Sequence, residues 1–136
     1  MKSIFFYGLF MDRELLIKKG FNPSEPILAY VKGFGLRIGE RASLVESEGE
    51  ISYGVVMRLG DSETDQLYSE ESVKAYVPVN WVAYISDTKQ INVVVYNLPR
   101  EMLKGKNKEY AEALANVGYK IGLPINYINE IKQWAM

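Results

Sequence analysis

Two adjacent glutamates, Glu70 and Glu71, are the residues of this sequence best suited by type to acid–base chemistry. They lie in the stretch QLYSEESVKAY, between an expected short helix and an expected strand. A positioned carboxylate can take a proton from one reacting atom and deliver it to another. The ordinary alternative is that both are solvated residues at a helix end, where the helix dipole slightly disfavours negative charge.

A second candidate is the turn Tyr7-Gly8-Leu9-Phe10, which follows an expected apolar strand. A turn leaving a strand can point successive N–H groups into one concave space, where they bind a carboxylate or a phosphate. The turn lacks both the GxGxxG and the Walker patterns, so we do not expect it to bind a nucleotide phosphate. A tight turn without a ligand is the alternative interpretation.

The tyrosines form a third group, because the chain has ten of them. Most tyrosines lie in a core or at its edge, with the polar tip directed outward. Tyr7, Tyr76 and Tyr110 stand at the ends of expected elements, where a hydroxyl can reach a pocket.

Composition excludes several kinds of chemistry. The chain has no cysteine and no histidine, which rules out disulfides, zinc–thiolate sites, cysteine nucleophiles and Ser-His-Asp triads. No calcium-loop pattern is present, so we expect neither a metal nor a cofactor. A net charge of −1 argues against a nucleic-acid partner. No apolar run approaches the roughly 20 residues of a membrane span, and the N-terminus lacks a signal-peptide pattern. We therefore expect a cytoplasmic protein that does not enter a membrane.

The order of the expected elements predicts the fold class. Apolar runs predict strands at 3–8, 28–39, 42–46, 51–59, 76–85 and 91–98, and helical patterns predict helices at 13–19, 63–70, 108–122 and 125–136. We expect SEGE to be the turn of a hairpin and Ser62 to cap a helix. Gly122 and Pro124 should separate the last two helices.

Strands that precede a helical pair favour an α+β fold. Glycines 33 and 35 indicate a bulge or a sharp bend, so five to seven strongly bent strands could form a small mixed barrel. The length predicts one domain, residues 1–136.

These segments together resemble the γ-glutamylcyclotransferase family of the bacterial and archaeal type, related to the γ-glutamylamine cyclotransferases. The family's strand ending in YGS or YGT matches residues 7–10, and its GVVY strand matches residues 53–59. Its C-terminal pattern Y…GAxxxGLPxxY matches Tyr110 followed by NVGYKIGLPINYINEI, residues 116–131. The chain departs from the family at Leu9 and Phe10, which replace polar or smaller residues, and at Ser72, which replaces a glycine.

The family's glutamate can be aligned in two ways. Counting from the leucine of the pattern LDxYEG favours Glu71, whereas the variant LYxEPG matches Glu70. Both residues therefore remain candidates for the general acid–base group.

The resemblance implies a γ-glutamyl cyclotransferase that needs no cofactor. In this reaction the α-amine of a γ-glutamyl compound attacks its own γ-carbonyl and releases 5-oxoproline and an amine or amino acid. One glutamate would move the proton, and burial would raise its pKa toward neutrality. The turn at Gly8 would bind the substrate carboxylate and the oxyanion. Tyr110, and less directly Tyr76, would contact the substrate.

Two other functions fit the same residues. The chain could be an inactive member of the fold that binds a small metabolite or a protein, as the altered YGLF turn suggests. It could also carry out a different reaction, because fold does not determine chemistry. The enzymatic hypothesis requires that Glu70 or Glu71 points into a pocket beside the Tyr7–Phe10 backbone, and it fails if both glutamates face solvent. The glycine-rich hairpin and the amphipathic C-terminus could form a homodimer surface.

Overall fold

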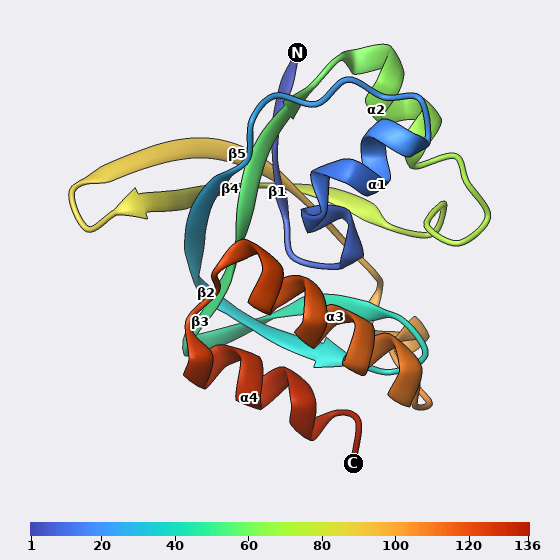
Figure 1. Ribbon diagram of the computed structural model, residues 1–136, viewed down its shortest axis with the longest axis vertical. Coiled ribbons are helices and arrows are strands. Elements are labelled where there is room, and N and C mark those ends of the chain that lie inside the picture. Colours follow the sequence, from blue (N-terminus) through green and yellow to red (C-terminus); the bar gives the residue numbers. More distant parts are fainter.

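The computed structural model covers residues 1–136 and consists of five strands, four α-helices and two short 3-10 turns (Figure 1). In chain order these are β1 (Lys2–Phe6), η1 (Leu9–Met11), α1 (Arg13–Lys18), β2 (Ile27–Ile38), β3 (Ala42–Leu59), α2 (Asp61–Leu67), β4 (Val77–Ser86), β5 (Lys89–Asn97), η2 (Arg100–Met102), α3 (Lys108–Ile121) and α4 (Ile125–Gln133). The predicted α+β class is confirmed.

The strands close into one barrel in the order β1-β3-β2-β4-β5. Neighbouring strands are antiparallel except β1 and β5, which meet in parallel at Ile4 and Val94. The sheet is therefore mixed and has five strands, as the sequence predicted. The C-terminal part of β4 and the N-terminal part of β5 project away from the barrel as a hairpin arm (Figure 1).

The barrel bends sharply at a bulge between β2 and β3. Lys32 pairs with Ile51 but Phe34 pairs with Glu46, so residues 47–50 of β3 stand opposite Gly33 alone. Gly33 has a φ of +85°, a conformation that glycine adopts without strain. The predicted bend at Gly33 is confirmed. The predicted hairpin at SEGE is wrong, because these residues belong to one continuous strand that pairs with β2 on both sides of the bulge.

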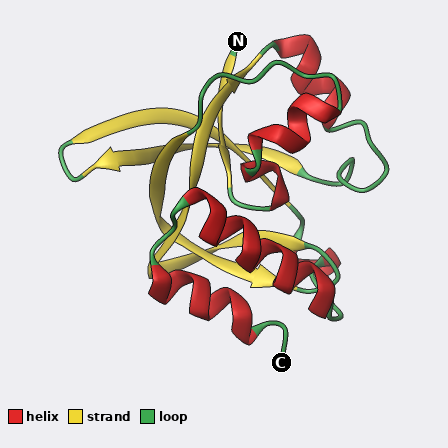
Figure 2. Ribbon diagram, in the orientation of Figure 1, coloured by secondary structure: helices red, strands yellow, loops and turns green.

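The helices cover two regions of the barrel (Figure 2): α1 and α2 lie near one end of β1, and α3 packs on α4 near the β2–β3 hairpin. Gly122 ends α3 in the left-handed conformation, with a φ of +86°, and Pro124 precedes α4, as predicted. The prediction for Ser62 is wrong. Gly60 is the N-cap of α2, and the Glu63 side chain at the third helical position accepts from the Gly60 amide.

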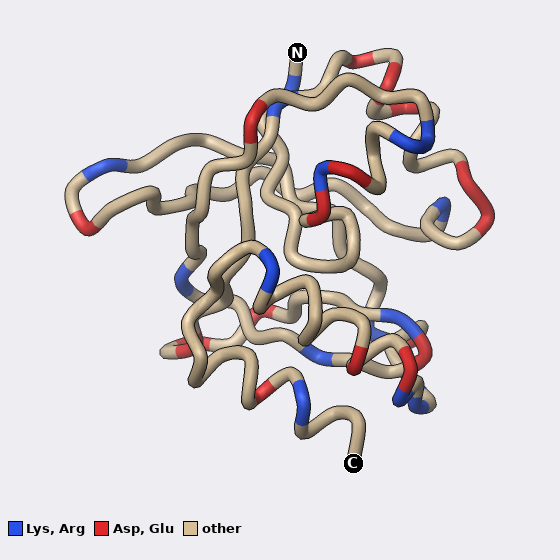
Figure 3. Tube along the Cα trace, viewed as in Figure 1, with Lys and Arg blue, Asp and Glu red and all other residues tan.

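One hydrophobic cluster of 29 buried residues joins the barrel interior to the inner faces of the helices. Lys and Arg residues are interspersed with Asp and Glu over the chain, without a region of one sign (Figure 3). No helix is both long and apolar enough to cross a bilayer. The protein thus has no extended face of one charge that would suit a highly charged partner.

Candidate functional site

A cavity of about 420 Å³ lies beside the end of β1, between the turn that follows β1, the β2–β3 turn and the segment joining α2 to β4. Its lining includes all six residues that the sequence analysis proposed for substrate binding: Tyr7, Gly8, Leu9, Phe10, Tyr76 and Tyr110. Tyr7 to Phe10 form the turn after β1, Tyr76 immediately precedes β4, and Tyr110 lies in α3. The fold thus brings together residues that are up to a hundred positions apart in the chain.

The turn at Gly8 is shaped by close approach rather than by an unusual dihedral angle. Gly8 has a φ of −106°, which other residues also adopt. A Cβ at this position would lie only 2.8 Å from the Tyr110 hydroxyl, so the missing side chain makes room for Tyr110. The Gly8 amide donates to no backbone carbonyl, which leaves it available beside the cavity.

Some of the tyrosine hydroxyls at the cavity donate a hydrogen bond to the protein, and others do not. Tyr7 donates to the carbonyl of Tyr96, and Tyr76 donates to the carbonyl of Ala42. Tyr68, Tyr96 and Tyr110 also line the cavity, and their hydroxyls donate to no group of the protein. They can therefore donate to a ligand.

Burial keeps these hydroxyls neutral. It raises the pKa of Tyr110 to about 12, against a smaller lowering by the Leu9 backbone amide. Burial also raises the pKa values of Tyr68 and Tyr76 above the usual range. At neutral pH these tyrosines are hydrogen-bond donors and not bases.

The two candidate glutamates lie outside the cavity lining. Glu71 has a side chain 88% exposed and forms an ion pair with Lys74 at 3.0 Å. Glu70 has a side chain 33% exposed, and its Oε1 lies 2.8 Å from the Nζ of Lys19. Lys19 lines the cavity, so Glu70 is in direct contact with a residue of the lining. Glu71 is directed to solvent.

Three charged residues of the lining escaped the sequence analysis: Lys19, Glu40 and Arg41. Lys19 follows the last turn of α1, and the other two form the turn between β2 and β3. No motif or spacing marked them, because exposed charges in turns are the commonest kind of surface residue. Only the closure of the barrel places them at the cavity.

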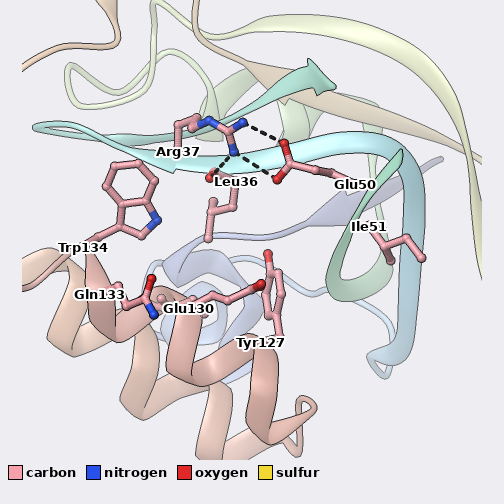
Figure 4. Close-up of a pocket in the computed structure, with 9 residues that line it drawn as sticks. Leu36, Arg37, Glu50, Ile51, Tyr127, Glu130, Gln133 and Trp134 are labelled. Atoms are coloured by element: carbon pink, nitrogen blue, oxygen red, sulfur yellow. Dashed lines mark hydrogen bonds and ion pairs between the residues drawn. The ribbon is translucent and has the colours of Figure 1, made fainter. Parts of the chain in front are cut away.

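A second cavity, of about 390 Å³, lies between α4 and the bent part of β2 and β3. Figure 4 shows Arg37 turned toward Glu50, with Tyr127, Gln133 and Trp134 facing them from the end of the chain. The Arg37 guanidinium donates to both Glu50 oxygens, at 3.2 and 2.7 Å, and to the Leu36 carbonyl. Hydrogen bonding to Arg37 lowers the pKa of Glu50 to about 2. Arg37 and Glu50 are thus paired with each other, whereas the exposed Glu130 carboxylate forms no ion pair and the buried Tyr127 hydroxyl has no hydrogen-bond partner.

Comparison with solved structures identifies the fold. One neighbour, a protein named gamma-glutamyl cyclotransferase, is 19% identical with a TM-score of 0.79, over 96% of this chain and 86% of the other. YkqA from Bacillus subtilis is 20% identical with a TM-score of 0.77, and this chain, 98% of which is covered, spans 54% of it. An aig2-like protein from Mus musculus is 14% identical with a TM-score of 0.61, over 80% and 90% of the two chains.

No family model matches the chain, and no curated protein matches it at a significant level. The similar structures nevertheless show that the protein has the fold of gamma-glutamyl cyclotransferase, as the sequence motifs predicted. At these identities the likeness establishes the fold alone, so the chemistry must be argued from the site.

Proposed function

We propose that this protein is a cyclotransferase that converts a γ-glutamyl compound into 5-oxoproline and a free amine or amino acid, in the cavity beside Gly8. The observation that carries the proposal is the free backbone amide of Gly8 beside the unengaged hydroxyl of Tyr110, at one wall of a cavity of about 420 Å³. Two such donors suit a carboxylate or a developing oxyanion. The shared fold and the motif resemblance support the same reaction class.

Leu9 and Phe10 do not weaken this role, since backbone donors act independently of the side chains they carry. The turn would hold the α-carboxylate of the glutamyl group, while the buried aromatic walls exclude water. Holding the chain folded supplies much of the advantage of an intramolecular reaction. Tyr76, engaged with the Ala42 carbonyl, would act as part of the wall.

Glu70 is the better candidate for proton transfer than Glu71, because only Glu70 is paired with a residue of the cavity lining. The ammonium of Lys19 occupies the position where the α-ammonium of a substrate could pair with the Glu70 carboxylate. A substrate that displaces Lys19 would bring its own amine next to this base. Burial by the substrate would also make the carboxylate a stronger base.

The reaction then proceeds in two stages. Glu70 takes a proton from the α-ammonium, and the amine nitrogen attacks the γ-carbonyl carbon to close a five-membered ring. The resulting oxyanion is stabilised by the turn amides. When the intermediate collapses, the bond from the γ-carbon to the leaving nitrogen breaks. Protonated Glu70 returns its proton to that nitrogen, and the ring nitrogen, which still carries two protons after the attack, releases one of them to water to give the neutral lactam.

The test is release of 5-oxoproline from γ-glutamyl dipeptides and γ-glutamyl amines by the native protein, Glu70→Gln, Glu71→Gln and the control Glu109→Gln. Glu109 lies in the first turn of α3 and forms no ion pair. Loss of a general acid–base should lower kcat by about 10²- to 10⁴-fold in Glu70→Gln. The other two variants should stay close to native. A loss confined to Glu71→Gln would assign the role to Glu71 and contradict our choice.

A second function, ligand binding without turnover, is favoured by one observation: neither glutamate lines the cavity. Calorimetric titration with the same compounds separates the two functions. Binding without 5-oxoproline release from any compound would establish the binding function and refute the cyclotransferase.

A further inference from the structure

We infer that Arg41 forms a second anion-binding position in the cavity, which binds a carboxylate on the leaving side of the ligand. The inference rests on the proposed function, since it takes the ligand to be a γ-glutamyl compound. It makes Arg41 a specificity-determining residue and names the ligand as one with two carboxylates. A compound whose leaving part is an uncharged amine would lack the second contact.

The contacts of Arg41 leave most of its donors free. Its Nη1 donates to the Ser72 carbonyl at 3.2 Å, and it makes no other side-chain hydrogen bond. A guanidinium has five N–H donors, so several remain available. No carboxylate lies within ion-pair distance of Arg41, although the residue is half-buried at the cavity wall.

The bond to Ser72 also fixes where the guanidinium lies. Ser72 belongs to the segment between α2 and β4 and itself lines the cavity. The nearby hydroxyl of Tyr76 feels the positive charge, which opposes the rise in its pKa caused by burial. The free donors therefore lie near Ser72 and Tyr76, at the part of the lining that the β2–β3 turn and the segment before β4 form.

Lys19, the other cation of the lining, does not offer the same site. Its ammonium is already paired with Glu70 at 2.8 Å, and it lies 6.0 Å from the centre of the Phe10 ring. The pair is neutral as a whole. Arg41 is thus the cation of the lining that has no anionic partner in the protein.

Glu40, next to Arg41 in the chain, is the one group of the lining that would oppose an anion. Its carboxylate is exposed and forms no ion pair. Repulsion from an exposed carboxylate is weakened by water and salt. Direct, bidentate contact with a guanidinium is stronger, because planar carboxylate and guanidinium groups match in geometry. The balance favours binding of a carboxylate.

The experiment compares two probes that differ only in this group: γ-glutamylglycine and γ-glutamylglycinamide. Dissociation constants are measured by calorimetry for the native protein, Arg41→Gln, Arg41→Lys and the control Arg58→Gln, together with release of 5-oxoproline. Arg58 lies exposed on β3, away from the cavity, and forms no ion pair. Because each variant is tested with both probes, a loss of folded protein cancels in the ratio.

We expect the native protein to bind γ-glutamylglycine about 10- to 100-fold more tightly than the glycinamide, the range for hydrogen bonds to a charged group. The ratio should fall to about one in Arg41→Gln, take an intermediate value in Arg41→Lys, and stay native in Arg58→Gln. Arg41→Gln should bind the glycinamide as the native protein does.

Equal binding of both probes by the native protein, or a ratio that survives in Arg41→Gln, would overturn the inference, even if 5-oxoproline is released and the proposed function stands. Binding with the expected ratios but without 5-oxoproline would support Arg41 and refute the cyclotransferase. Failure of both probes to bind would overturn both proposals.

Discussion

Two cavities beside the barrel, of about 420 and 390 Å³, are similar in size, and each is lined by an arginine. They differ in what that arginine contacts. Arg37 donates to both Glu50 oxygens and to the Leu36 carbonyl, whereas Arg41 donates to one backbone carbonyl. Arg37 and Arg41 are only four positions apart in the β2–β3 hairpin, yet the guanidinium of Arg37 is paired with a carboxylate and that of Arg41 is not.

This difference in pairing distinguishes two cavities that have similar volumes. A polar group that is already paired inside the protein gains little by exchanging its partner for a ligand. A polar group held at a wall without a partner gains the whole interaction. By this criterion we propose the Gly8 cavity, with Arg41 and its free tyrosine hydroxyls, as the binding site for an anionic ligand. In the Arg37 cavity the arginine is already paired, and the groups without a partner, the Tyr127 hydroxyl and the Glu130 carboxylate, offer an anion no cation.

Among substitutions of residues that line the two cavities, Gly8→Ala should have the largest effect. The added Cβ would meet the Tyr110 hydroxyl at 2.8 Å, so the side chain and the turn would have to separate. Misplacement of a site by about 1 Å can cost roughly 10²-fold in rate, and we expect a loss of that order in kcat/KM. The double variant Gly8→Ala/Tyr110→Phe removes the clashing oxygen and should be no worse than Tyr110→Phe alone. Native kcat/KM in Gly8→Ala would contradict the close packing.

Tyr110→Phe should have the next largest effect. The variant loses one free hydroxyl at the cavity, and loss of a ligand hydrogen bond should weaken binding or kcat/KM by about tenfold. Thermal unfolding should change little, because this hydroxyl donates to no group of the protein and only accepts a hydrogen bond from the Leu9 backbone amide. A large loss of stability without a change in binding would show that Tyr110 belongs to the core and not to the site.

Arg37→Gln should alter stability and leave ligand binding unchanged. The pair is partly exposed, so its loss should cost about 0.2–1 kcal/mol in the free energy of unfolding. Urea denaturation at neutral pH measures this cost, and calorimetry with γ-glutamylglycine measures binding. Weaker binding of the probe in Arg37→Gln would remove the distinction between the two cavities.

The smallest effect is a pH dependence that belongs to the Arg37 cavity. Arg37 lowers the pKa of Glu50 in the folded state from 4.5 to about 2. The stabilisation is therefore fully present above pH 4.5 and is lost as the pH falls from 4.5 through 2. The difference in unfolding free energy between the native protein and Glu50→Gln should be constant at neutral pH and should shrink over that window. A difference that grows with acidification would contradict the ion pair.

Much of the architecture was predictable because it depends on local pattern. Alternating and continuous apolar runs marked the strands, and Gly122 and Pro124 marked the boundary of the last two helices. The bend at Gly33 followed from a glycine inside a strand. The error at SEGE has a physical cause: a polar segment containing glycine is suited equally to a hairpin turn and to a wide bulge. Pairing with β2 on both sides selected the bulge.

The sequence by itself limited the chemistry that the protein could use and marked the turn that we propose as its site. The absence of histidine and cysteine left carboxylates, tyrosines and backbone amides, and Gly8 stood out between a strand and a helix. The tertiary structure alone decided which side chains share that space. It placed Lys19 and Arg41 at the cavity, joined Glu70 to Lys19, and directed Glu71 to solvent. Side-chain direction and pairing depend on contacts between residues far apart in the chain, and no local pattern carries that information.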